Sequence, residues 1–325
     1  MVIDIRACNI SRTYKIKEQR SGGFFRGLRP RSKTIQALKN VSMTVYRGEA
    51  VGIVGLNGSG KSTLVKLLTG IIKPDQGTIN CLGYDPFRQR SRYVTNIGVS
   101  FGQKTLLYSD LPLRWSLELY RVVYGLNRDQ FEANLDLLDV FFEVRPFLMQ
   151  PVRKLSFGQR VRGDLVASLL HSPQLLFLDE PNIGLDILSS ESLAKYVRYR
   201  RSQGKTTLIV THDIELIAQS CDRLILLDDG KKLIDQSLSA MKLEVPRVIE
   251  LIYSQVRAPS KFEAILANAL SVEREDHHIK LLVAQNDLDK VIQALTSACQ
   301  VLRLEIKSPS IKNVIHDFIT QTRLG

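Results

Sequence analysis

The residues from Gly55 to Thr63 have the types and the spacing of a phosphate-binding turn. They follow an apolar run that ends at Val54 and precede a stretch with helical spacing, which predicts a strand, a glycine-rich turn and a helix N-terminus. Glycines let main-chain N–H groups converge on phosphate oxygens, and the helix N-terminus adds partial positive charge. Lys61 would reach the outer phosphates, and Ser62 would hold Mg²⁺ through its hydroxyl. The alternative is a glycine-rich turn that binds nothing.

A pair of carboxylates, Asp179 and Glu180, follows the apolar run Leu175–Leu178. Four large apolar residues in a row are typical of a strand that is buried on both faces of a parallel sheet. Ligands of such sheets bind at the carboxyl ends of the strands, so Asp179 can face Mg²⁺ and Glu180 an attacking water. His212 follows the next buried strand, Thr206–Val210, and would lie beside Glu180 if the two strands are neighbours. The alternatives are an acid pair that faces solvent and a histidine that satisfies local hydrogen bonds.

The composition is that of an ordinary globular protein with one large domain or two: 325 residues, 44% hydrophobic and 24% charged. No run approaches the ~18 apolar residues of a membrane-spanning helix, and the N-terminus has no signal-peptide pattern, so we expect a cytosolic location. The four cysteines are far apart and lack metal or redox spacing. The net charge of +12 favours an anionic partner, which could be a membrane surface, a nucleic acid or a nucleotide.

Two features precede the phosphate-binding turn. Tyr14 could offer its ring face to a nucleotide base, or it could be a half-buried tyrosine of a strand. Residues 12 to 33 hold eight basic residues against one acid, Glu18, with Phe24 and Phe25 among them. This basic insert, centred on residues 20–31, suits a lipid headgroup surface or a membrane partner, and a solvated loop between two strands is the alternative.

The apolar pattern becomes helical from Leu111 to Leu170, which predicts a helical insert in the larger domain. The last helix of this insert follows the segment Leu155–Gln159. In this segment Ser156 is a good helix cap, and Gly158 allows a close approach of main chain. A hairpin over residues 223–231 would end the first domain near residue 240.

Residues 245 to 325 show a different order of elements: strand, helix, two strands, helix and strand. This order predicts a small ferredoxin-like module, followed by an amphipathic helix over residues 310–319. His277 and His278 could form a metal pair, but adjacent residues of a strand point to opposite faces, so we expect a turn. Nothing else in the tail suggests catalysis, and the tail could regulate the protein or add to a dimer interface.

Taken together, these motifs over residues 1–240 resemble the ATP-binding (ATPase) subunits of ABC transporters. Many nucleotidases share the phosphate-binding turn, whereas Leu155–Gln159 resembles the far more specific ABC signature. The resemblance implies an α/β fold: a P-loop NTPase cassette with a mixed sheet and a helical subdomain at about 109–170. The α+β ferredoxin-like domain at 245–325 would follow the cassette.

The resemblance also implies a role for each matching residue. Tyr14 would stack on adenine, Glu180 would be the general base, and His212 would contact the γ-phosphate. Gln103 would be the Q-loop glutamine that touches Mg²⁺ and senses the membrane partner, and Asp179 would help to hold Mg²⁺. The residues that would wrap the phosphates of ATP are Gly55, Asn57, Gly58, Ser59, Gly60, Lys61, Ser62 and Thr63. Those expected at the interface with a second subunit are Ser156, Gly158, Gln159 and Asp186.

Two positions depart from the family's pattern, because Phe157 stands where glycine is commonest and Asn182 where threonine or serine is usual. We still expect activity, since Ser156 and Gly158 are kept. The segment 180–186 and the basic insert look closest to the bacterial drug-, antibiotic- or peptide-exporter ATPases.

The resemblance implies a head-to-tail dimer of identical or different ATPase subunits. Each ATP would lie between the phosphate-binding turn of one subunit and the Ser156 turn of the other. We therefore expect a peripheral ATPase at the cytoplasmic face of the membrane that powers export through a separate transmembrane permease, with no nucleic-acid partner. The alternatives are a soluble ATP-dependent switch on ribosomes or nucleic acid, and an importer ATPase with a mostly β regulatory tail.

Overall fold

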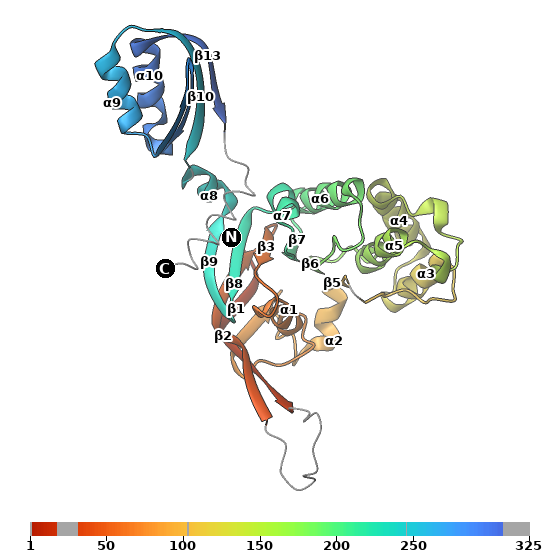
Figure 1. Cartoon of the computed structure of the whole chain (residues 1–325). Coiled ribbons are helices and arrows are strands. Elements are labelled where there is room, and N and C mark those ends of the chain that lie inside the picture. Colours follow the sequence, from red (N-terminus) through yellow and green to blue (C-terminus); the bar gives the residue numbers. More distant parts are fainter. Residues whose placement is uncertain (1, 18–31, 103, 245, 308–325) are drawn as a thin grey trace, which may run out of the picture. The chain divides into compact units, whose positions relative to one another are not determined.

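The computed structural model describes residues 2–17, 32–102, 104–244 and 246–307 (Figure 1). Three predictions lie outside the described residues: the basic insert at 20–31, the position of Gln103, and the helix over 310–319. The chain divides into two compact units, Met1–Asp235 and Gln236–Gly325.

A six-stranded sheet with the strand order β5-β6-β7-β3-β8-β9 forms the centre of the first unit. The strands from β5 to β8 are parallel, and each pairs in register with its neighbour. Their bounds are β3 Ala50–Val54, β5 Ile97–Phe101, β6 Leu175–Asp179, β7 Thr206–Val210, β8 Arg223–Asp228 and β9 Lys231–Ser237. The predicted mixed α/β sheet is confirmed.

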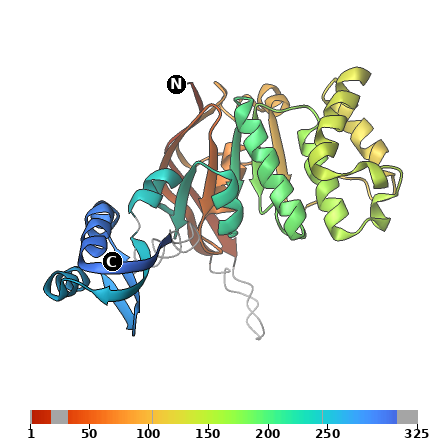
Figure 2. The same ribbon diagram turned by 90° about the horizontal axis from the view of Figure 1, so that it is seen from above.

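Both faces of this sheet are buried, because successive side chains of a strand point to opposite sides. In β6, Leu175 and Phe177 join a core that includes helix α1 (Lys61–Leu68), and Leu176 and Leu178 join a second core on the other face. Helices α6 (Ile187–Ser202) and α7 (Ile214–Ser220) lie along this second face (Figures 1 and 2). Polar side chains of the central strands can therefore reach solvent or a ligand only near the strand ends.

A second sheet, with the antiparallel order β2-β1-β4, packs into the first core. The strands β1 (Ile3–Lys17) and β2 (Ser32–Tyr46) have 15 residues each, which is longer than their alternating patterns predicted, and β4 is Gln76–Cys81. Register shifts interrupt their pairing at several points, so the two long strands do not form one uniform ladder.

Helices α3 (Leu113–Val123), α4 (Arg128–Phe142) and α5 (Phe157–Leu169) form a separate group within the first unit (Figure 1). They occupy the stretch for which the sequence predicted a helical insert, and their apolar side chains continue the second core. The shorter helical segments of the unit are α2 (Arg90–Tyr93) and the 3-10 helices Val94–Asn96, Arg145–Phe147 and Val152–Lys154.

The second unit has a four-stranded antiparallel sheet with the order β11-β12-β10-β13. Helices α9 and α10 cover one face of it (Figures 1 and 2). Its elements are α8 Leu238–Glu244, β10 Arg247–Val256, α9 Pro259–Ala267, β11 Ser271–Glu275, β12 His278–Val283, the 3-10 helix Gln285–Asp287, α10 Leu288–Ala298 and β13 Cys299–Lys307. This is the predicted βαββαβ order. Of the pair for which the sequence predicted a turn, His277 lies in the turn between β11 and β12, whereas His278 is the first residue of β12.

The start of β7 is anchored by an arginine that the sequence analysis missed. Arg200 of α6 is only 1% exposed. Its guanidinium donates to the Thr207 Oγ1 at 3.2 Å and to the carbonyl oxygens of Pro173 and Thr206 at 3.1 Å each. Burial lowers the pKa of Arg200, and the neighbouring Tyr196 opposes that effect. These bonds join α6, β7 and the loop before β6.

We expect Arg200→Ala to lower the free energy of unfolding by about 3 kcal/mol, because it removes charged hydrogen bonds and leaves buried acceptors without a donor. Arg201→Ala is the matched control, since Arg201 is 55% exposed and pairs with Asp222. Such a surface pair contributes no more than about 1 kcal/mol. Urea unfolding of the two variants checks this difference, and an equal small loss for both would contradict the anchoring role of Arg200.

Candidate nucleotide site

The glycines of the phosphate-binding turn are required by close packing of main chain. A Cβ atom at Gly55 would lie 2.2 Å from the carbonyl oxygen of Leu227, and one at Gly60 would lie 2.4 Å from that of Ala37. Gly60 also has a φ of 104°, which side chains disfavour. The turn therefore fits between β3, α1 and two neighbouring segments only because these residues are glycine.

Lys61 at the start of α1 folds back over this turn. Its side chain is largely buried, and its ammonium donates to the carbonyl oxygens of Gly55 at 2.7 Å and Leu56 at 2.9 Å. Burial lowers the pKa of Lys61, while the carboxylates of Glu180 and Asp179 raise it. The turn thus holds a positive group within a concave run of main chain, which suits an anionic ligand.

Asp179 ends β6 beside this turn, and one of its oxygens is suited to a cation. Its Oδ1 is buried and has no hydrogen-bond partner among the residues that the structure describes. Burial raises the pKa of Asp179, and a hydrogen bond with the Ser62 side chain opposes the shift. A hydroxyl and a carboxylate oxygen are ligands that Mg²⁺ prefers, so the two residues fit a magnesium ion.

A pocket of about 300 Å³ opens at this point. Its walls combine the end of β6 with the start of α1 and the segment after β5, and its lining residues are Ser62, Lys66, Ile71, Phe101, Gly102, Lys104, Asp179 and Glu180. Gly102 and Lys104 flank Gln103, whose placement is outside the described residues. Three of the predicted site residues, Ser62, Asp179 and Glu180, therefore line one pocket.

Glu180 leaves the strand with a left-handed φ of 52°, an uncommon conformation for a residue with a side chain. Its N–H donates to the carbonyl oxygen of Val210 at 2.7 Å. Its Oε2 lies 2.9 Å from Nδ1 of His212 and accepts a hydrogen bond from the Thr211 hydroxyl at 3.1 Å. Because β6 and β7 are neighbours, the structure brings Glu180 and His212 into contact.

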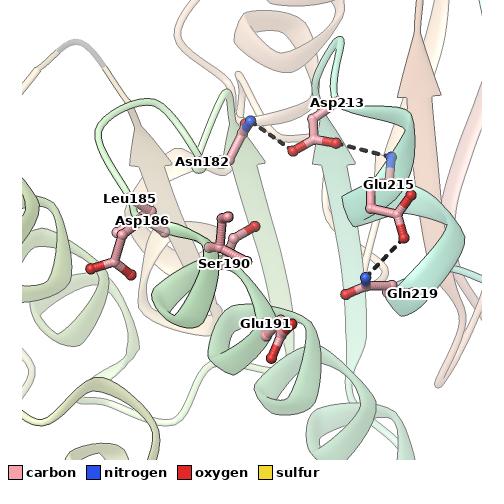
Figure 3. A pocket seen from close by; sticks show the side chains of 9 residues that line it. Asn182, Leu185, Asp186, Ser190, Glu191, Asp213, Glu215 and Gln219 are labelled. Carbon is pink, nitrogen blue, oxygen red and sulfur yellow. Dashed lines mark hydrogen bonds between the residues drawn. The ribbon is translucent and has the colours of Figure 1, made fainter.

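Three residues that the sequence analysis did not connect join this contact to the start of α7. The Thr211 hydroxyl is also 3.0 Å from Oδ1 of Asn182, whose Nδ2 donates to the Asp213 carboxylate at 3.1 Å (Figure 3). Asp213 caps α7 by accepting the N–H groups of Glu215 and Leu216. The only sequence signal for this network is that its members follow the ends of two buried strands.

Tyr14 lies half-buried on β1, with the Arg12 guanidinium 5.3 Å from the centre of its ring. Arg12 is held in turn by Asp75, whose Oδ1 accepts its hydrogen bond at 2.6 Å. A role of Tyr14 in stacking on a base stays a prediction.

The Ser156 turn belongs to a different part of the unit, the helical group at the N-terminus of α5 (Figure 1). Ser156 and Gln159 form a capping box: Ser156 Oγ accepts the Gln159 N–H at 3.2 Å, and the Gln159 side chain accepts the Ser156 N–H at 2.9 Å. Ser156 and Phe157 are exposed, and the Phe157 ring packs on Gly184, where a Cβ would lie 2.0 Å from it.

Asp186 caps α6 by accepting the Ser189 N–H at 2.7 Å, which lowers the pKa of Asp186.

Comparison with known proteins decides the family. A family model described as "ABC transporter" matches residues 38–182. The chain is 32% identical over 216 residues to the ABC transporter ATP-binding protein NatA of Bacillus subtilis, a match that covers 66% of this chain and 88% of NatA. The chain belongs to the ATP-binding proteins of ABC transporters.

Other relatives and solved structures agree with this assignment. The chain is 34% identical to the daunorubicin resistance ATP-binding protein DrrA3 of Streptomyces coeruleorubidus, over 64% of this chain and 66% of DrrA3. It superposes with a TM-score of 0.62 and 25% identity on a dimeric post-hydrolysis state of the ATP-binding cassette MJ0796 bound to ADP and Pi. That match covers 72% of this chain and 98% of the cassette. The predicted ABC cassette fold is confirmed.

This ABC ATPase subunit binds and hydrolyses ATP, as the sequence predicted. Subunits of the family dimerise and work with transmembrane permeases. In the part of the chain that the structure describes, no helix has both the length and the apolar character needed to cross a membrane.

Proposed function

We propose that the chain is the ATPase subunit of an exporter, acting at the cytoplasmic face of the membrane as half of a head-to-tail dimer. Two of its relatives are a daunorubicin resistance ATP-binding protein and a Nod factor export ATP-binding protein of Sinorhizobium fredii. The latter is 35% identical over 60% of this chain, which spans 57% of that relative. These relatives support the export direction.

In this proposal Glu180 accepts the proton of the attacking water. The observation that carries it is the position of the Glu180 carboxylate at the end of β6, in one pocket with Asp179 and Ser62. Its described hydrogen bonds, to Thr211 and His212, engage Oε2 and leave Oε1 to face a water. His212 is 70% exposed, so it can also reach toward a terminal phosphate.

Lys61 and the turn from Gly55 to Thr63 bind the phosphates, through the ammonium and the main-chain N–H groups. Ser62 and Asp179 hold Mg²⁺, with Gln103 as a further candidate ligand. When bound, Mg²⁺ supplies positive charge against the phosphate oxygens. The buried Oδ1 of Asp179, which has no partner in the described part of the chain, supports this assignment, because a buried carboxylate oxygen is costly without a partner.

The second subunit completes each site through its Ser156 turn. This turn offers the first N–H groups of α5 and a hydroxyl, a combination that favours an anion. Ser156 is exposed and belongs to the helical group, whereas the phosphate-binding turn lies at the start of α1. A turn of this chemistry facing outward supports contact with the ATP of a neighbouring copy, to which Asp186 would add.

A stripe of apolar side chains on α3 supports a docking surface for the permease. Trp115, Leu119, Val122 and Val123 are 54%, 42%, 65% and 72% exposed. Their spacing places them along one side of the helix. Exposed apolar stripes of this kind mark protein–protein contact surfaces.

We expect Glu180→Gln to reduce kcat by at least about 100-fold, because the amide keeps the shape of the side chain but cannot accept a proton. ATP binding should persist, and the variant should stay a dimer with ATP, as light scattering can measure. Glu191→Gln, an exposed position on α6, is the control and should behave as the wild type. Near-normal hydrolysis by Glu180→Gln would remove Glu180 from the base role.

Charges placed on the α3 stripe should separate the subunit from its permease. With the wild-type protein, we expect a multi-span membrane protein to co-purify from detergent-solubilised membranes, and the double variant Trp115→Glu, Val122→Glu should lose it while keeping its ATPase activity in solution. Val140→Glu is the control, because Val140 is 76% exposed on α4 outside the stripe. Co-purification of ribosomes or nucleic acid without a membrane protein would overturn the transport function.

A further inference from the structure

The hydroxyl of Thr211 has one hydrogen to donate and lies within hydrogen-bond distance of two acceptors. It is 3.1 Å from Oε2 of Glu180 and 3.0 Å from Oδ1 of Asn182, and Thr211 is completely buried. Its oxygen also accepts the N–H of Asp213 at 3.0 Å. Since a hydroxyl carries a single hydrogen, Thr211 can donate fully to only one of the two acceptors at a time.

The amide of Asn182 is oriented by the Asp213 carboxylate. Nδ2 of Asn182 donates to Oδ2 of Asp213 at 3.1 Å, along the wall of a pocket of about 220 Å³ (Figure 3). A reversed amide would put its oxygen against that carboxylate. The other oxygen of Asp213 is held by the N–H groups at the start of α7. The acceptor oxygen of Asn182 is therefore fixed toward Thr211.

We infer that Asn182 is a positioning residue for hydrolysis: it gives Thr211 a second acceptor, so that Glu180 can leave Thr211 and turn to the attacking water. The inference rests on the proposed role of Glu180. When the carboxylate moves away, the Thr211 hydrogen turns to Asn182. Without Asn182, the same movement would leave the buried Thr211 hydroxyl without an acceptor. This is unfavourable, so the Glu180 carboxylate stays bound to Thr211. The effect falls on turnover, because Asn182 acts through Thr211 and Glu180.

The test is a double-mutant cycle on the full-length chain, measured by steady-state ATP hydrolysis. Asn182→Ala should lower kcat by about 5- to 150-fold, the range expected when one buried polar group loses its hydrogen-bond partner, with KM and ATP affinity unchanged. In the Thr211→Val background, where no hydroxyl needs a partner, adding Asn182→Ala should cause no further loss. Equal losses in both backgrounds, or a raised KM with unchanged kcat, would overturn the inference.

Two further variants separate this role from a loss of fold. Gln219→Ala is the control. Gln219 lines the same pocket, but its side-chain amide donates to Glu215 and, among the described residues, bonds with no member of the Asn182–Thr211–Glu180 network, so kcat should not change (Figure 3). Asn182→Asp keeps the side-chain volume but faces the Asp213 carboxylate with a like charge, so it should lose activity. Adding Asp213→Asn restores the hydrogen bond in the reverse direction, because the amide at position 213 now donates to the carboxylate at position 182. Most of kcat should then return. Failure of this rescue would count against the inference.

The outcomes also separate the inference from the proposed function. Turnover retained by Glu180→Gln would remove the proposed base itself. An inactive Glu180→Gln together with an additive cycle for Asn182 and Thr211 would leave that base in place and remove only the role of Asn182.

Discussion

The parallel pairing of β6 with β7 is the interaction on which the whole site depends. Asp179 and Val210 are the last pair of the ladder, so the next residues of the two strands, Glu180 and Thr211, lie side by side. Both strands are buried on two faces, and a shift of one residue would turn every side chain to the opposite face. The register of apolar packing therefore also sets the distance between the groups proposed for catalysis.

Strand β7 is held at both of its ends by polar contacts that its buried middle cannot make. Arg200 binds Thr206 and Thr207 at the start, and Thr211 connects Glu180 with Asn182 at the finish. Unpartnered polar groups are costly in such a core, so each of these contacts favours a single position of the strand. The left-handed φ of Glu180 is tolerated within this fixed frame.

Local chemistry could be predicted from the sequence, whereas contacts between distant segments could not. The glycine spacing from Gly55 to Thr63 and the apolar run before Asp179 are short sequence patterns, and each is typical of one local structure. Arg200 looked like one more basic residue of a helix, because only the packing of α6 on β7 buries it. Asn182 stood out as a departure from the family's pattern, but its bonds to Thr211 and Asp213 depend on which strands are neighbours.

The central claim is that each ATP lies between the phosphate-binding turn of one subunit and the Ser156 turn of another. The most direct test mixes two variants, Lys61→Ala and Ser156→Arg, and measures ATP hydrolysis. Each variant alone should be inactive, because every site in its dimer lacks one half. A mixed dimer has one site with both halves intact, so activity should return on mixing. Mixed dimers that form but stay inactive would contradict this account.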